Sequence, residues 1–243
     1  MPSDSDLATA VRAPVHTIAD VLAVMEAIQE SVPSEDGIGW FNRLYHRTTK
    51  NIQAALAEGR FVDADWTAQL DVVFARYYFS AIDRFLQGSA DTPHAWSPLF
   101  ERRSSNDIAP MQFALAGMNA HINRDLSFAL VDMASASNAM AARSSARHGD
   151  YETVNAILVE TERQVKEWLE GAFLRQIEFE VGRIEDVIAI WSVEHARDAA
   201  WTRAETQWEV RGINAIASGY ATVIDKFAGL ATRALLLPTR ILA

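Results

Sequence analysis

Glycine and proline residues divide this chain into long segments in which apolar residues recur at the spacing of an α-helix. No segment shows the alternation of apolar and polar residues that is typical of a half-buried strand. The loops between the segments are mostly short, which favours antiparallel packing of neighbouring helices. We therefore predict an all-α fold, a bundle of about seven to eight helices around a buried central helix.

Signals at the ends of the segments set the predicted helix boundaries. Thr17 and Asp20 form a capping-box pattern, and Asp63 and Asp150 have the position of N-cap residues. Pro110 is placed to open a long helix. The predicted helices cover roughly residues 17–30, 38–58, 63–86, 97–102, 110–135, 151–177, 182–212 and 213–236.

Length and composition favour one domain. The chain has 243 residues, of which 49% are hydrophobic and 22% are charged, enough for one large core. The best candidate boundary, Ser135–Gly149, separates helices that are each too apolar to stand alone. We expect residues 1–243 to form a single helical domain, with residues 1–14 flexible.

The charge balance and the absence of cysteine narrow the choice of partners. With 32 acidic and 22 basic residues the formal charge is −10, which repels nucleic acid and anionic lipid. No cysteine is present for a disulfide, a thiolate nucleophile or a cysteine-based zinc site. The N-terminus has no signal-peptide pattern, and no apolar run reaches membrane-spanning length. We expect a cytoplasmic protein without nucleic-acid partner or membrane insertion; a homodimer stays open.

The segment Met111–Met133 is an unusual central helix. It contains no lysine and no glutamate, and its apolar residues lie all around the helix, as in a helix buried on every side. A buried polar group without a partner costs about 1–3 kcal/mol, so polar residues here need a bonded network or a cavity. The segment nevertheless carries six uncharged or acidic polar residues: Gln112, Asn119, His121, Asn123, Asp125 and Ser127.

His121 and Asp125 are the main catalytic candidates. They are four positions apart and therefore neighbours on one helix face, and Gly117 nearby would allow close approach of another helix or a ligand. A carboxylate beside an imidazole can orient its tautomer, raise its basicity or share a metal with it. A purely structural His–Asp hydrogen bond within the bundle is the alternative reading.

Further candidates come from the same helix and from neighbouring ones. His46, one turn after Asn42, is a third catalytic candidate if it faces the same cavity. Amides that could hold a substrate oxygen and aromatic residues that could wall a pocket complete the predicted substrate-binding set: Asn119, Asn123, Asn42, Tyr45, Tyr77 and Trp201.

Several segments together resemble a family of actinobacterial proteins known only as a domain of unknown function. The family has no established activity, so the resemblance implies a single domain without supplying a mechanism. The segments are FNRLY (41–45), RFVDADW (60–66), LDVVFARYYF (70–79), WSPLFERR (96–103) and QFALAGMNAHINRDL (112–126).

The His-x-x-x-Asp pair is also weakly similar to one helix of the zinc-dependent phospholipase C and single-strand nuclease group. The three-zinc site of that group needs further ligands, including a histidine shortly after the aspartate. Residues 126–132 contain none. The similarity therefore implies at most one divalent metal, held by His121, Asp125 and His46, and no other cofactor is expected.

The leading functional hypothesis is a small-molecule enzyme of biosynthesis acting on a partly apolar substrate in a pocket between helices. His121 would be the general base or acid and Asp125 its orienting partner. Isomerisation, cyclisation, elimination and hydrolysis all suit such a pair. A metal-dependent hydrolase with His and Asp ligands and a non-catalytic binding or scaffold protein are the alternatives.

Overall fold

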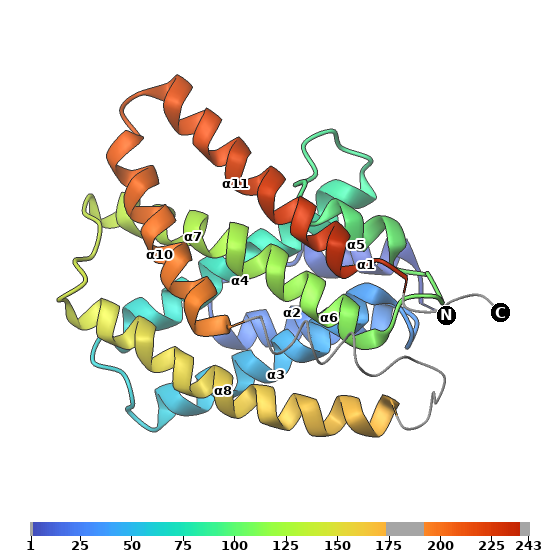
Figure 1. The fold of residues 1–243 in the computed structure, drawn as a ribbon. Coiled ribbons are helices and arrows are strands. Elements are labelled where there is room, and N and C mark those ends of the chain that lie inside the picture. Colours follow the sequence, from blue (N-terminus) through green and yellow to red (C-terminus); the bar gives the residue numbers. More distant parts are fainter. Residues whose placement is uncertain (1, 174–191, 239–243) are drawn as a thin grey trace.

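The computed structural model describes residues 2–173 and 192–238, which form helices and connecting loops without any strand (Figure 1). The predicted all-α fold is confirmed for this part of the chain. The helices are α1 (Asp4–Val11), α2 (Ile18–Ser31), α3 (Gly37–Ala57), α4 (Ala64–Leu86), α5 (Ser97–Arg102), α6 (Pro110–Ala120), the π-helix η1 (His121–Asp125), α7 (Leu126–Ser137), α8 (Ala146–Phe173), α10 (Val193–Val210) and α11 (Asn214–Leu235).

Most predicted helix ends lie within a few residues of the observed ones, because local capping defines them. Thr17 and Asp20 form both hydrogen bonds of a capping box at the start of α2. The Asp63 side chain accepts a hydrogen bond from the Trp66 amide and so caps α4. These predicted N-termini are confirmed.

The start of α8 differs from the prediction. This helix begins at Ala146, so Asp150 lies inside it and is not its cap. The Asp150 carboxylate instead accepts hydrogen bonds from the amides of Val62 and Asp63, at 2.8 and 2.6 Å, and ties α8 to the turn before α4. Of the helix predicted over 182–212, residues 182–191 lie outside the described part, as do residues 174–177 of the preceding helix.

The N-terminal segment that we expected to be flexible contains the ordered helix α1. The Ser3 hydroxyl caps its start, and Leu7 is completely buried in the main hydrophobic cluster. Arg12 forms an ion pair with Asp83 of α4 at 2.7 Å, and Asp4 pairs with Arg103 after α5. Apolar burial and these pairs fix the segment to the bundle.

The continuous rod formed by α6, η1 and α7 runs through the middle of the molecule (Figure 1). It packs against α3 and α4 on one side and against α10 and α11 on the other. A side chain at Gly117 would meet Phe41 of α3, because a Cβ atom there would lie 2.3 Å from the ring. The predictions of a buried central helix and of close approach at Gly117 are confirmed.

None of the helices in the described residues has the length and apolar character that crossing a lipid bilayer requires.

Candidate functional site

The candidate site begins at a defect in the central helix. We predicted one uninterrupted helix over residues 110–135, but His121–Asp125 forms a π-helical turn in which the Leu126 amide bonds to the His121 carbonyl, five residues back. Such turns lengthen the hydrogen-bonded ring by one residue and occur frequently at functional sites. The two catalytic candidates stand at the first and last positions of this turn.

His121 and Asp125 form a buried pair. His121 Nδ1 lies 3.0 Å from Asp125 Oδ2, and the two side chains are 3% and 0% exposed. The Trp96 indole donates to the same carboxylate oxygen at 2.8 Å, while the Arg124 guanidinium donates to Oδ1. Donors therefore reach both oxygens of Asp125, and one of them is a cation that compensates the negative charge.

This arrangement fixes the tautomer of His121. An ionised carboxylate can only accept hydrogen bonds, so Nδ1 carries the proton and Nε2 keeps its lone pair. Burial lowers the pKa of His121, and this outweighs the opposing effect of the Asp125 hydrogen bond. The imidazole is therefore neutral at pH 7, and its Nε2 has no hydrogen-bond partner among the described residues.

Aromatic neighbours hold the imidazole ring in place. Phe74 of α4 stacks on it with ring centroids 3.5 Å apart and planes nearly parallel, and Tyr45 of α3 meets it edge-on at 4.5 Å. With one nitrogen bonded to Asp125 and one face covered by Phe74, the ring has little freedom to turn.

A second layer of contacts fixes Arg124, and through it Asp125. Arg124 Nε lies 2.9 Å from Asp225 Oδ1 on α11. Asp225 in turn accepts hydrogen bonds from the backbone amides of His94 and Ala95, in the loop before α5. The guanidinium that compensates the charge of Asp125 is thus held by contacts that join three segments distant in sequence.

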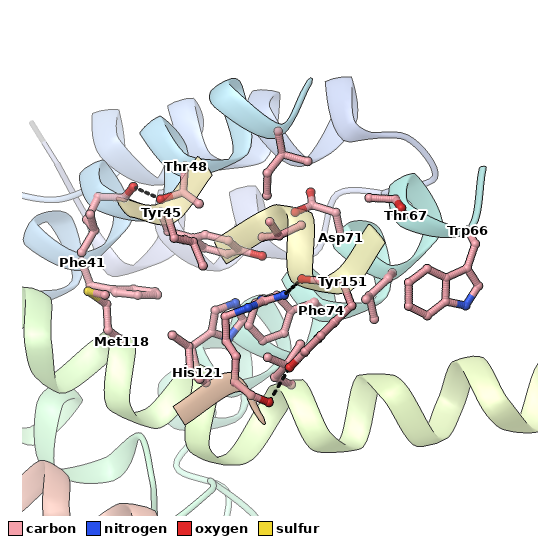
Figure 2. A pocket seen from close by; sticks show the side chains of 18 residues that line it. Phe41, Tyr45, Thr48, Trp66, Thr67, Asp71, Phe74, Met118, His121 and Tyr151 are labelled. Atoms are coloured by element: carbon pink, nitrogen blue, oxygen red, sulfur yellow. Dashed lines mark hydrogen bonds between the residues drawn. The ribbon is translucent and has the colours of Figure 1, made fainter. Parts of the chain in front are cut away.

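The His121 ring lines a cavity of about 80 Å³ between α3, α4, η1, α8 and α10 (Figure 2). This is several times the minimum of roughly 10–15 Å³ that one water requires, so the cavity has room for a few waters or a small organic molecule. Most of its wall is apolar or aromatic, including Phe41, Trp66 and Phe74. The predicted Tyr45 also belongs to this wall, so the structure brings it together with His121.

Asp71 of α4 lines the same cavity and was missed in the sequence. Its side chain is buried, its Oδ2 atom has no hydrogen-bond partner among the described residues, and burial raises its pKa to about 7. The Tyr45 hydroxyl is also without a partner, and burial raises its pKa well above the usual range. The sequence does contain a signal for this residue, because Asp71 stands between Leu70 and Val72 in an otherwise apolar run.

The three predicted asparagines lie away from this cavity and brace helices. Asn119 donates to Ala228 O and Thr232 Oγ1 of α11, both at 2.9 Å, and accepts from Asn123. Asn42 donates to Met25 O of α2 at 2.8 Å. These contacts belong to helix packing.

His46, Tyr77 and Trp201 also lie outside the cavity wall. Their polar atoms contact Glu26 at 3.2 Å, Asp132 at 2.7 Å and Glu205 at 3.1 Å, respectively. The metal ligand set suggested by the sequence is not assembled, because His46 is turned toward α2. Within the described ranges, no three His, Cys, Asp or Glu side chains are grouped as a metal site would require.

A family model described as "Family of unknown function (DUF5995)" matches residues 18–238. The chain belongs to this family. The match confirms the resemblance seen in the sequence segments and includes every residue of the buried pair and its cavity. No curated protein and no solved structure matches the chain. The chemistry of the cavity is therefore the basis for a functional proposal.

Proposed function

We propose that this protein is a small-molecule enzyme in which His121 acts as a general base, and then as a general acid, on a ligand held in the cavity. One observation carries the proposal. The Nε2 lone pair of a buried, neutral imidazole has no partner in the part of the chain that the structure describes, while Nδ1 is bonded to an ionised carboxylate.

Each neighbour supports a defined step of proton transfer. Nε2 accepts a proton from the ligand, and the imidazolium that results is stabilised by Asp125 through the existing hydrogen bond. Asp125 is a positioning residue, and Phe74 keeps the ring plane fixed. The lowered pKa of His121 leaves the base unprotonated at neutral pH. Isomerisation, elimination, cyclisation and hydrolysis can all use such a transfer.

The two alternative functions receive less support. A metal shared by His121 and Asp125 would compete with the donors that already occupy both carboxylate oxygens, from Trp96, Arg124 and His121 itself. A purely structural network would be expected to satisfy its buried polar atoms internally. Unpartnered buried atoms occur at several places in the described residues, and three of them, on Tyr45, Asp71 and His121, belong to residues around this one cavity.

Acetyl transfer from acetic anhydride, a four-carbon reagent, tests whether the lone pair is available to a molecule small enough for the cavity. In this reaction Nε2 attacks one carbonyl carbon and acetate leaves; water then releases the second acetate and regenerates the imidazole. We expect acid release above background to be about 100-fold or more faster with the wild-type protein than with His121→Gln, the lower end of the range for one acid–base group. His46→Gln is the matched control and should retain the wild-type rate.

The Asp125→Asn variant tests whether Asp125 positions His121 for catalysis or only stabilises the fold. The amide can donate to Nδ1 and favour the other tautomer, so we expect slower acetyl transfer at a temperature where the variant is folded. Equal rates in wild type, His121→Gln and Asp125→Asn would mean that the buried pair only braces the bundle, and the proposed function would be abandoned.

A further inference from the structure

We propose that the cavity binds a small protonated amine with an apolar substituent, and that the Asp71 carboxylate is its counter-ion. This inference rests on the proposed function, because it assigns a ligand class to the same cavity. It adds Asp71 and the aromatic residues of α3, α4 and α8, which line the same cavity as His121.

The Asp71 carboxyl group lines the cavity and has hydrogen-bonding capacity that no described residue uses. It lies on the buried side of α4 and is 6% exposed. No lysine, arginine or histidine of the described residues forms an ion pair with it, and its Oδ2 atom accepts no hydrogen bond. A buried carboxylate without a cation is costly, so an arriving cation gains both an ion pair and hydrogen bonds.

The cation present in the cavity wall is engaged elsewhere. Arg197 of α10 donates through Nε to Asn155 Oδ1 and through Nη2 to the Tyr151 carbonyl, each at 2.7 Å. Its guanidinium also lies over the Tyr151 ring, 4.0 Å from the centroid. These contacts hold Arg197 against α8, which leaves Asp71 free for a ligand.

The remaining wall suits a cation that carries a hydrocarbon group. Aromatic rings of Tyr45, Trp66, Phe74 and Tyr151 surround the cavity, and Figure 2 shows them gathered with Asp71 around one space. Aromatic faces attract ammonium groups, and more strongly where water is excluded. The volume of about 80 Å³ limits the ligand to a few carbon atoms. A short primary amine meets each of these conditions.

Isothermal calorimetry with butylamine and its neutral analogue butanol tests the inference. Wild-type protein should bind butylamine at least about tenfold more tightly than butanol, the contribution expected of one charged hydrogen bond. Asp71→Asn keeps the shape of the site and should remove this preference. His46→Gln should keep it, because the His46 side chain lies outside the cavity wall.

The pH dependence gives an independent readout. The ionised form of Asp71 binds the amine, so butylamine affinity should rise as pH increases through about 7. The other titratable groups facing the cavity are Tyr45, Tyr151, Arg197 and His121. The first three do not change charge near neutral pH, and the measurement in His121→Gln removes the fourth.

Three results would overturn the inference: equal binding of butylamine and butanol, an amine preference that persists in Asp71→Asn, or affinity that increases toward acid pH. The last would mean that protonated Asp71 donates to a neutral ligand. Acetyl transfer that still depends on His121 would leave the proposed function intact in each case. Loss of that dependence with amine selectivity retained would instead indicate a binding protein.

Discussion

Burial shifts the pKa of the His121 imidazole and that of the Asp71 carboxyl group in opposite directions. Both lose hydration, yet His121 has a carboxylate partner and Asp71 has none. The pKa of His121 is lowered and that of Asp71 is raised, so burial favours the neutral form of each. A neutral imidazole with an unused lone pair suits proton transfer, and a carboxyl group that ionises near pH 7 can accept a cationic ligand.

Replacing Asp71 should stabilise the folded protein at neutral pH. Its folded pKa, about 7, exceeds the ordinary value of 3.8, so the folded state holds the proton more tightly than the unfolded state. The native state therefore loses stability as pH rises from 3.8 to about 7, by up to ~4 kcal/mol. Asp71→Asn removes this loss.

Urea unfolding at several pH values measures this effect. The stability difference between Asp71→Asn and wild type should grow across that interval and then become constant. Asp65→Asn, on the exposed face of the same helix, should change stability by less than about 0.5 kcal/mol. A pH-independent difference for Asp71→Asn would show that its carboxyl group is not desolvated.

At the level of residues, sequence spacing predicted the His121–Asp125 pair because both partners lie on one helix turn. Sequence spacing did not predict which polar residues face a cavity, because this depends on contacts with other helices. Asn119 has an equally suggestive neighbour in Asn123, but its amide is bonded to Ala228, 109 positions away. His46 likewise contacts Glu26 of another helix. Periodicity within one helix contains no information about such partners.

Helix α6 can pack closely against α3 because residue 117 is a glycine and has no side chain. A Cβ atom there would lie 2.3 Å from Phe41, whose ring packs against Tyr78 and Trp96 and lines the cavity. The glycine thus sets the distance between α6 and α3, and with it the shape of the candidate site.

Gly117→Ala should destabilise the protein despite the higher helix propensity of alanine. Overpacking typically costs about 1–3 kcal/mol, against a propensity gain of ~1 kcal/mol, and because a Cβ atom at 2.3 Å favours the upper part of that range we expect a net loss of up to about 2 kcal/mol. Gly149→Ala is the matched control, because no atom lies within 4 Å of its added Cβ inside α8. It should gain about 0.5–1 kcal/mol.

Thermal unfolding distinguishes the two glycine variants, with opposite shifts of roughly 2–4 °C per kcal/mol. If both alanines raised the melting temperature, α3 and α6 would not be in the tight contact described.

Helix ends with local caps, such as those at Thr17 and Asp63, could be predicted because the capping residues are neighbours in sequence. The π-turn at His121–Asp125 could not, because neither proline nor glycine marks it. Its geometry depends on Trp96, Phe74 and Arg124 contacts that arise only when the helices pack.

The whole molecule extends beyond the part matched by the family model, which begins at residue 18. Helix α1 precedes this boundary and still contributes Leu7, Ala10 and Val11 to the main hydrophobic cluster. Arg76 of α4 also donates to the carbonyl of Val15, which ties the following loop to the bundle.

Leu7→Ala should therefore lower the free energy of unfolding by about 2–5 kcal/mol, the range for a fully buried leucine. Thr9→Ala, on the exposed side of α1, should have an effect below about 0.5 kcal/mol. Chemical denaturation of the two variants provides the comparison. Similar stability in both would mean that α1 is detached from the bundle in solution.

Nitrogen NMR of isotope-labelled histidine tests the central claim most directly, with His121→Gln used to assign the signals. At pH 7 we predict a protonated Nδ1 and an unprotonated Nε2 for His121, with the cationic ring appearing only below its ordinary pKa of 6.5. A protonated Nε2, or a cationic ring at neutral pH, would contradict the claim that His121 presents a free base to the cavity.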